Sequence, residues 1–374
     1  MQFIDLKTQY QRIEQEMQKA VSEVVASQRY IMGPQVAELE EQLADYVGVK
    51  YALSCSSGTD ALVIPLLAYK LEKNDAVFVP SFTFFASAES ISLAGGTPVF
   101  VDSDPRTFNC TKQTLEEAYQ KVIAKGELNP RGIIAVDLFG LPADYASIDS
   151  FAKEHDLFVV EDAAQGFGSE YAGKKAGSFG NVAATSFFPA KPLGAYGDGG
   201  AIFTDDDQLA ELFTSIRVHG QGMDKYDNVR MGLNGRLDTI QAAVLLEKLK
   251  IFDSEIELRN QVATTYTARL QDVLETPYVP ANMMSVWAQY TLLTKSAKER
   301  ECIAKALDDH EIPWAVYYRI PVHLSTAYRH LGYEEGSLPV CESLSERAFS
   351  LPMHPYLSSE DIDRITAVIR EALQ

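Results

Sequence analysis

Basic residues are scarce in this sequence compared with acidic ones. It has 33 Lys and Arg against 52 Asp and Glu, which gives a formal net charge of −19 at pH 7. A protein with that charge repels the phosphate backbone of nucleic acids, so we expect no nucleic-acid partner. Local basic groups are still able to hold a single anionic ligand.

Cysteine is also rare. The chain has four, and no two of them form a Cys-x-x-Cys pair; they are Cys55, Cys110, Cys302 and Cys341. This spacing indicates neither a zinc site nor a disulfide framework, and we expect no bound metal. Unpaired cysteines fit a reducing compartment, so the sequence predicts a cytoplasmic protein.

Long apolar runs are absent as well. None reaches the roughly 18 residues of a membrane span, and the polar residues 1–12 lack the apolar stretch of a signal peptide. We therefore expect no membrane association. The sequence also lacks the pattern GxxxxGK[ST], and no GxGxxG follows a strand, which argues against nucleoside-triphosphate hydrolysis and dinucleotide redox chemistry.

Short apolar segments alternate with helical patterns through most of the chain, and 46% of its 374 residues are hydrophobic. The segments typical of strands are 51–54, 76–79, 98–101, 132–136, 157–160, 183–188 and 201–203. The segments with helical periodicity are 14–25, 36–46, 60–69, 86–94 and 146–155. This alternation predicts an α/β fold with a mostly parallel sheet covered by helices on both faces.

A long helical pattern over residues 236–252 precedes a change in composition, and we expect this helix to bridge two domains. Beyond it the composition indicates a smaller α+β domain that closes with a helix from Ser359 to near Leu373. We therefore predict a large domain with N-terminal helices over residues 1–252 and a small C-terminal domain over residues 253–374.

The segment 159–204 carries the residues with the most chemical content. An apolar strand there ends at Asp162, and α/β proteins bind ligands at the carboxyl ends of their strands. Gln165 adds a neutral donor and acceptor shortly afterwards. Lys191 follows the next strand and precedes a glycine-rich turn at residues 197–200.

A lysine and a strand-end carboxylate are what pyridoxal phosphate (PLP) chemistry requires. The amine bonds to the cofactor aldehyde, and the carboxylate keeps the pyridine nitrogen protonated so that the ring can act as an electron sink. Taken singly, however, Asp162 is more typical of a helix cap, and Lys191 is more typical of a solvated side chain. The residues alone indicate a ligand-binding α/β enzyme and do not single out PLP.

A candidate phosphate site lies where a strand passes through a loop into a helix. The backbone N–H groups of Gly58, Thr59 and Asp60 would point at an anion there, helped by the helix dipole. An ordinary capped helix explains the same residues equally well. The segment 80–85 follows another strand, and one of its aromatic rings is a candidate for stacking on a cofactor, although most Phe residues serve only core packing.

Several motifs spread over the chain occur together in one family. They are Ser57-Gly58-Thr59-Asp60-Ala61-Leu62, Pro80-Ser81-Phe82-Thr83-Phe84, Glu161-Asp162-Ala163-Ala164-Gln165, Ser186-Phe187-Phe188-Pro189-Ala190-Lys191, Gly197-Asp198-Gly199-Gly200, Asn234-Gly235-Arg236-Leu237-Asp238 and Leu351-Pro352-Met353-His354-Pro355. With these motifs the sequence resembles, over nearly its whole length, the DegT/DnrJ/EryC1/StrS family of sugar aminotransferases. The resemblance implies a fold-type-I PLP enzyme with a large PLP-binding domain.

The resemblance also implies a role for each residue near the cofactor ring. Lys191 matches the lysine that forms the Schiff base with PLP. Asp162 matches the partner of the pyridine nitrogen, and Gln165 matches the neighbour of the ring hydroxyl. Phe84 occupies the position that stacks on the ring.

Around the phosphate, Ser186 together with Gly58 and Thr59 resembles the family's phosphate cup. The asparagine that matches Asn234 reaches the phosphate from the neighbouring subunit in this family. The resemblance therefore implies an obligate homodimer with shared active sites.

The resemblance favours transamination, because related dehydratases have histidine where this chain has Lys191. The most similar-looking subgroup uses glutamate to aminate C3 of UDP-linked 2-acetamido-3-oxo-glucuronate, a nucleotide-linked keto-sugar, for surface polysaccharide such as O-antigen. The residues implied in substrate binding are Arg236, Tyr317, Tyr318 and Arg319. Tyr317 stands where many members have histidine, and Arg319 where proline is common, which leaves the identity of the sugar open.

Three other functions stay open at this point. The chain could aminate a 4-keto-6-deoxy nucleotide sugar, or it could be a PLP-dependent sugar dehydratase; analysis of the product separates these. A non-catalytic regulator that keeps the fold as a ligand sensor is the third. The intact pair of Lys191 and Asp162, and the lack of a DNA-binding segment, count against the regulator.

Overall fold

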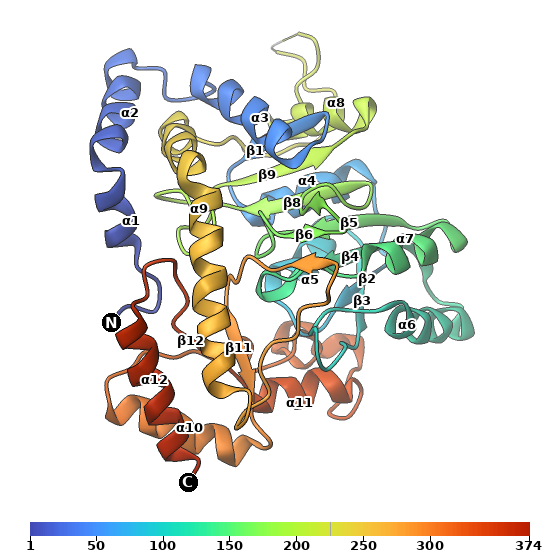
Figure 1. Cartoon of the computed structure of the whole chain (residues 1–374). Coiled ribbons are helices and arrows are strands. Elements are labelled where there is room, and N and C mark those ends of the chain that lie inside the picture. Colours follow the sequence, from blue (N-terminus) through green and yellow to red (C-terminus); the bar gives the residue numbers. More distant parts are fainter. Residues whose placement is uncertain (225) are drawn as a thin grey trace.

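A seven-stranded sheet forms the centre of the large domain (Figure 1). The structure is a computed structural model, and it describes residues 1–224 and 226–374. The sheet has the order β1-β9-β8-β5-β4-β2-β3. Its strands are β1 (Tyr51–Cys55), β2 (Asp75–Pro80), β3 (Thr97–Val101), β4 (Asn129–Val136), β5 (Phe158–Asp162), β8 (Val182–Ser186) and β9 (Gly200–Thr204).

The pairing of these strands confirms the predicted mostly parallel sheet. Neighbouring strands from β3 through β8 pair in parallel, whereas β9 pairs antiparallel with both β8 and β1. Only β9 therefore runs against the rest of this sheet. Because the other strands run the same way, the carboxyl ends of β5 and β8 lie at one edge, and that edge carries the predicted site.

Helices cover both faces of the sheet, as expected. On one face the buried core includes residues of α4 (Gly58–Ala68), α5 (Phe85–Leu93) and α8 (Asp207–Ile216). On the other face it includes α6 (Lys112–Lys125) and α7 (Tyr145–Glu154). Strand β2 shows the division, since Val77 and Val79 pack in the first core and Ala76 and Phe78 in the second, as the twofold period of a strand requires.

The N-terminal helices run beside the large domain. They are α1 (Leu6–Arg12), α2 (Glu14–Ser27) and α3 (Pro34–Val47). The second and third confirm predicted helices, and α4 keeps Pro65 inside it. Helices α1, α6 and α8 were not expected from the sequence.

Helix α9 (Thr239–Leu270) is much longer than the helix predicted over residues 236–252. Beyond Phe252 the buried stripe continues, but it contains the charged residues Glu255 and Arg259, which interrupt the apolar pattern on which the prediction relied. Figure 1 shows α9 running from the large domain down to the C-terminal helices. Residue 252 lies inside this helix, and the domain boundary placed there stays a prediction.

The C-terminal part packs against the second half of α9. It contains an antiparallel pair, β11 (Tyr290–Leu293) and β12 (Ala348–Leu351), and the helices α10 (Ala297–Asp309), α11 (Pro339–Arg347) and α12 (Ser359–Ala372). The final helix confirms its prediction, although its N-cap is Ser358, whose hydroxyl accepts from the amide of Asp361. A small sheet joins β10 (Met283–Met284), β6 (Glu170–Tyr171) and β7 (Lys174–Lys175).

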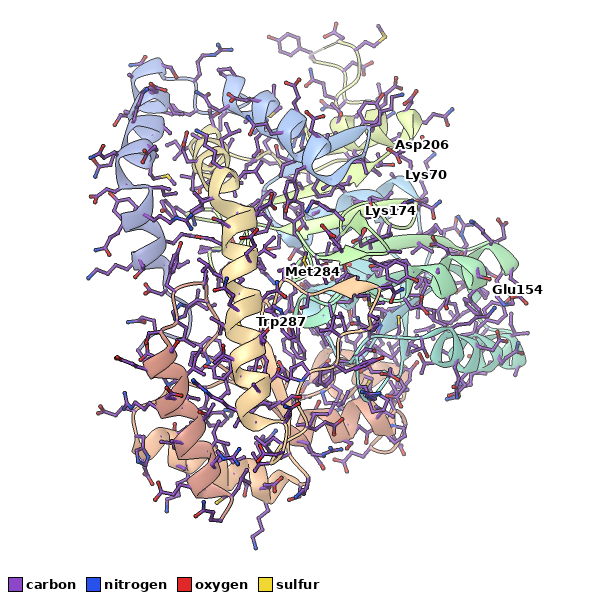
Figure 2. All side chains as sticks on the ribbon, viewed as in Figure 1. Lys70, Glu154, Lys174, Asp206, Met284 and Trp287 are labelled. Carbon is purple, nitrogen blue, oxygen red and sulfur yellow. The ribbon has the colours of Figure 1, made fainter. Side chains whose placement is uncertain are left out.

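Many charged side chains lie at the surface of the molecule. Figure 2 shows Lys70, Glu154, Lys174 and Asp206 near its rim, and all four are exposed. Among the helices over the described ranges, none combines the length and the apolar character needed to cross a bilayer.

Candidate active site

Asp162 ends strand β5 and is almost fully buried, with 4% of its surface exposed. Its Oδ2 accepts a hydrogen bond from the Ser87 hydroxyl at 2.7 Å, and its Oδ1 accepts from the Ala164 amide at 3.1 Å. Burial raises the pKa of this carboxyl, while the two donors and the charge of Lys191 act to lower it. The donors fix the orientation of the carboxylate at the edge of the sheet.

Lys191 lies in the loop between β8 and β9, close enough to Asp162 for their charges to interact. Burial lowers the pKa of its amine, and the negative charge of Asp162 acts in the opposite direction. A lowered pKa increases the share of the neutral amine, which is the nucleophilic form. The structure thus brings together the two residues predicted to be catalytic.

The loop that carries Lys191 folds tightly on itself. The Lys191 amide donates to the Phe188 carbonyl at 2.8 Å, and the Ala195 amide donates to the Phe187 carbonyl at 2.7 Å. A Cβ at Gly194 would lie 2.4 Å from the Pro189 carbonyl oxygen, so glycine is required there.

Lys248 holds the same loop from helix α9. Its side chain is buried, its Nζ donates to the Gly194 carbonyl at 2.7 Å, and it lies 4.4 Å from the centre of the Tyr196 ring. Burial lowers the pKa of Lys248 to about 8, with the charge of Glu255 acting to raise it. This contact connects the bridging helix to the loop of Lys191.

The residues predicted to bind the phosphate lie at the start of α4. The helix begins at Gly58, and a Cβ there would lie 2.8 Å from Ser186 Oγ, so the absence of a side chain leaves the Gly58 backbone against the serine. The expectation for Asp60 needs correction, because its amide already donates to the N-cap hydroxyl of Ser57 at 3.0 Å. Gly58, Thr59 and Ser186 therefore make up the candidate anion site.

Gln165 and Tyr318 are directly connected. Gln165 Nε2 donates to the Tyr318 hydroxyl at 2.9 Å, and Gln165 Oε1 accepts from the Phe139 amide at 2.7 Å. Burial raises the pKa of Tyr318, and the charge of Asp162 adds to the rise. Tyr318, predicted for substrate binding, thus lies against the predicted cofactor residues.

Phe84 leaves a large aromatic face uncovered beside these polar groups. It is 56% exposed although it immediately precedes α5, and its ring centre lies 6.2 Å from that of Tyr318. An exposed ring, a buried carboxylate next to a lysine and a glycine-lined anion site together fit PLP, whose flat ring, pyridine nitrogen and phosphate need these three features.

The remaining predicted residues lie on two segments, 234–236 and 317–319. Asn234 is exposed, and its Oδ1 accepts from the Arg236 guanidinium at 2.5 Å. The intervening Gly235 carbonyl accepts from the Ser56 amide at 3.0 Å, so this segment runs beside the phosphate loop. That Asn234 reaches the cofactor of a neighbouring subunit stays a prediction.

Tyr317 and Arg319 precede and follow Tyr318, and their side chains differ in exposure. The half-buried Tyr317 ring lies 6.3 Å from Phe3 and 5.8 Å from Tyr318, while Arg319 is exposed. The charge of Arg319 helps to lower the pKa of Arg300, after the larger effect of burial. Tyr317 therefore lies next to the site through Tyr318, whereas Arg319 interacts with Arg300 of α10.

Sequence reasoning missed Ser87 and Lys248. Ser87 follows Thr83 by four residues, and the two hydroxyls lie 3.1 Å apart. A small polar residue in the first turn after a strand was the available signal for it. Nothing in the sequence indicated a role for Lys248, because a lysine at its position in a helical pattern is typical of the protein surface.

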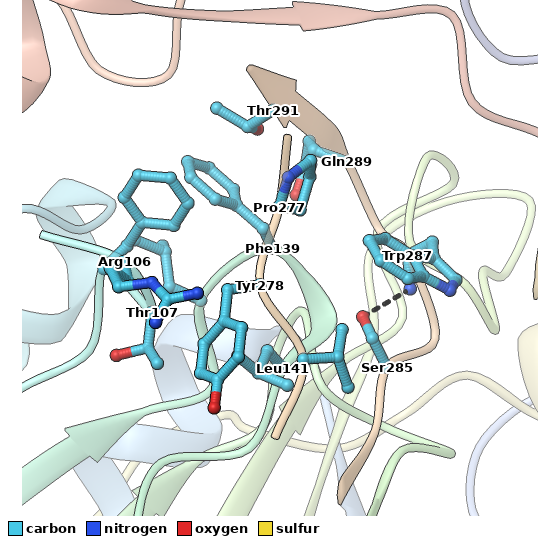
Figure 3. Close-up of a pocket in the computed structure, with 13 residues that line it drawn as sticks. Arg106, Thr107, Phe139, Leu141, Pro277, Tyr278, Ser285, Trp287, Gln289 and Thr291 are labelled. Atoms are coloured by element: carbon cyan, nitrogen blue, oxygen red, sulfur yellow. Dashed lines mark hydrogen bonds between the residues drawn. The ribbon is translucent and has the colours of Figure 1, made fainter. Parts of the chain in front are cut away.

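A small pocket lies beside this site (Figure 3). Arg106 stacks over the Tyr278 ring at 3.8 Å on one side, and the Trp287 amide donates to Ser285 Oγ at 3.1 Å on another. Its volume of about 20 Å³ has room for little more than a water molecule, and no predicted site residue lines it. A sugar nucleotide does not fit there.

The chain belongs to the DegT/DnrJ/EryC1/StrS aminotransferase family, whose model matches residues 11–370. It is an aminotransferase, and its cofactor is pyridoxal phosphate. Bound PLP supplies an electron sink for charge that develops at the substrate carbon.

Individual relatives match along nearly the full chain. The UDP-2-acetamido-2-deoxy-3-oxo-D-glucuronate aminotransferase of Pseudomonas aeruginosa is 45% identical over 372 residues, covering 99% of each chain. The crystal structure of a DegT DnrJ EryC1 StrS aminotransferase from Brucella abortus is 50% identical, with a TM-score of 0.96, over 100% of this chain and 99% of that one. The structure of ntda from Bacillus subtilis with bound cofactor PMP is 26% identical, with a TM-score of 0.88, over 99% of this chain and 83% of that one.

Proposed function

We propose that this enzyme moves an amino group from glutamate to C3 of a UDP-linked 3-keto sugar of the 2-acetamido-3-oxo-glucuronate type. The observation that carries the proposal is the buried carboxyl group of Asp162 next to the half-buried Lys191, with the exposed ring of Phe84 in the same site. The 45% identity to an enzyme named for that sugar, over 99% of each chain, supports this choice of substrate.

In this proposal Lys191 binds the cofactor and moves the proton at the substrate carbon. Its lowered pKa provides a neutral amine for that step. Asp162 keeps the pyridine nitrogen protonated, and Ser87 and the Ala164 amide hold Asp162 in place. Gln165, supported by Tyr318, lies beside the ring hydroxyl.

The substrate brings a diphosphate and a carboxylate to a chain of net charge −19, so it needs local cations. Arg236 and Arg319 are the candidates, because a guanidinium binds phosphate and carboxylate through a planar fork of donors. Both lie on segments next to the site, and Arg319 is exposed. We assign the diphosphate to Arg236 and the sugar carboxylate to Arg319.

The proposed active species is a homodimer in the cytoplasm. The side chain of Asn234 is exposed and would face a second subunit, while its backbone neighbour Gly235 accepts a hydrogen bond from Ser56. All four cysteines are free thiols, as a reducing compartment would keep them. The product would serve surface polysaccharide synthesis, such as that of O-antigen.

One experiment separates this function from its alternatives. Purified enzyme receives glutamate with one of three sugars. They are UDP-2-acetamido-3-oxo-glucuronate, the corresponding UDP-linked 3-oxo-glucose without the C6 carboxylate, and a TDP-4-keto-6-deoxy sugar. Mass spectrometry detects the amino sugar and NMR locates the amine, with Lys191→Ala as the inactive control. We expect amination at C3 and preference for the uronate. Amination only at C4, or loss of a hydroxyl without amination, would replace the proposal by the 4-keto or the dehydratase function.

A further inference from the structure

Two more carboxyl groups are buried directly behind Asp162. Glu161 precedes it in β5, and Asp137 follows the end of the neighbouring strand β4. Neither has any exposed surface. The Asp137 amide donates to the Asp162 backbone carbonyl at 3.0 Å, so the three acids share one edge of the sheet. Three negative charges buried together would repel one another strongly.

Asp137 has one oxygen with partners and one without. Its Oδ1 accepts from the Tyr145 hydroxyl at 2.8 Å and from the Ala143 amide at 2.9 Å. Its Oδ2 is fully buried and has no hydrogen-bond partner among the described residues. A buried acceptor without a donor costs free energy, so a hydrogen has to come from a neighbouring group.

That neighbour is the carboxyl group of Glu161. Glu161 Oε1 accepts from the Gly177 amide at 2.7 Å, and its Oε2 accepts from the Phe179 amide at 2.8 Å. The carboxyl groups of Glu161 and Asp137 are also close enough to interact, and a hydrogen bond between them would raise the pKa of Glu161 and lower that of Asp137. Two carboxylates cannot bond in this way, because neither has a hydrogen to donate.

The surroundings of the two carboxyl groups favour a proton bound to the pair. Burial raises the pKa of Glu161 well above its usual range, and it raises that of Asp137 to about 7. The other titratable groups that face the pair are Tyr145, Asp162 and Cys110, which are neutral or negative near pH 7. None of these three supplies a positive charge that would stabilise a second anion.

We propose that Glu161 is a neutral carboxylic acid near pH 7, that its proton is donated to Asp137 Oδ2, and that this shared proton makes the pair positioning residues for Asp162. With the proton present, the ends of β4 and β5 stay together and Asp162 keeps its orientation. Loss of the proton would add a negative charge beside Asp162 and force the two strand ends apart. The last clause of the proposal rests on the role proposed above for Asp162.

Infrared spectroscopy of the holoenzyme tests the proton itself. We expect the wild type to show a carboxylic-acid C=O stretch near neutral pH that shifts in D2O. Asp137→Asn should abolish it, because the amide supplies the hydrogen and lets Glu161 ionise, and Glu161→Gln should abolish it as well. Asp45→Asn, an exposed acid on α3, is the matched control and should keep the band. No such band in the wild type, or a band that survives both substitutions, overturns the proposal.

The pH dependence of unfolding gives a second readout that does not require activity. Above the ordinary Glu value of 4.5, Glu161 in the folded pair keeps a proton that the unfolded chain releases. Stability should therefore fall as pH rises above this value, by up to about tenfold in the unfolding constant per pH unit. Asp137→Asn should remove this slope and Asp45→Asn should not. Equal slopes in wild type and Asp137→Asn contradict the shared proton.

The positioning role has its own readout, the pH dependence of the visible absorbance of the bound cofactor. Asp137→Asn should shift the midpoint of this titration, and Asp45→Asn should leave it in place. An unchanged midpoint in Asp137→Asn overturns the positioning role. The infrared band is independent of the reaction, so an enzyme with the band but without transamination contradicts only the proposed function.

Discussion

The hydroxyl of Ser87 donates to Asp162 Oδ2 across 2.7 Å, although the two residues are 75 positions apart in the chain. Ser87 lies in the first turn of α5, and Asp162 ends β5. A hydrogen bond to a charged group is among the stronger ones in proteins. This contact links the orientation of the buried carboxylate to a helix on one face of the sheet.

Replacement of Ser87 by alanine should slow transamination without loss of the fold. Losing a hydrogen bond to a charged group costs about 1.5–3 kcal/mol, which corresponds to roughly ten- to a hundredfold in rate if it is lost in the transition state. The rate of the glutamate half-reaction measures the effect. Ser90→Ala, a buried serine of the same helix whose hydroxyl contacts only the Ser87 carbonyl, is the control and should stay close to wild type.

Replacement of Lys191 by alanine should abolish multiple turnover. The amine is the group predicted to bond the cofactor and carry the proton, and alanine provides neither function. The visible absorbance of the purified protein should disappear together with the activity. Lys248→Arg keeps a cation under the same loop and should retain both properties; undiminished turnover in Lys191→Ala would remove the central assignment.

Asp162→Asn should retain cofactor but lose more than tenfold in rate, which is about 1.4 kcal/mol of barrier. An amide has nearly the same shape, and its one oxygen can replace one of the two accepting oxygens, but it cannot keep the pyridine nitrogen protonated. Cofactor content and turnover number, measured on the same preparation, separate binding from catalysis. A variant within twofold of wild type would contradict the assigned role.

We expect Lys248 to make the free energy of unfolding of the wild type rise as the pH becomes alkaline. Its pKa is lowered from 10.5 to about 8 in the folded protein, so the unfolded chain binds more protons between these values. Stability relative to Lys248→Met should therefore rise through this window, by up to about 1.4 kcal/mol per pH unit. Chemical denaturation at several pH values measures it, and the exposed Lys250→Met should show no such trend.

Mixed subunits test the shared site. If Asn234 serves the cofactor of its partner, Lys191→Ala and Asn234→Ala subunits should each be impaired alone and recover activity together. One site of each heterodimer would then contain both intact residues. Verified subunit exchange with no recovered activity would place Asn234 in its own subunit's site.

The fold could be predicted from the sequence where the local pattern and the burial agree. Strand β5 is apolar from Phe158 to Val160, and its residues from Val159 to Asp162 are buried, as is usual in a parallel sheet covered on both faces. The end of α9 could not be predicted, because Glu255 and Arg259 are buried there by partners distant in sequence. Glu255 accepts from Gln9, and Arg259 donates to the carbonyls of Trp287 and Met353.

The candidate site shows the same limit. Lys191 and Asp162 were found through motifs, because each lies in a run of residues that the family shares. Ser87 and Lys248 act through single contacts across the fold, and nothing local distinguishes them from other serines and lysines. The interaction between Asp137 and Glu161 was equally inaccessible, since it depends on the pairing of β4 with β5.

Helix α9 extends from the large domain to the C-terminal part, and its 32 residues give it a length of about 48 Å. Lys248 of this helix donates a hydrogen bond to the Gly194 carbonyl in the loop of Lys191. Three turns further along, Arg259 donates to the Met353 carbonyl of the C-terminal part. One helix therefore holds both the loop of Lys191 and the C-terminal part, so the position of each relative to the other depends on α9.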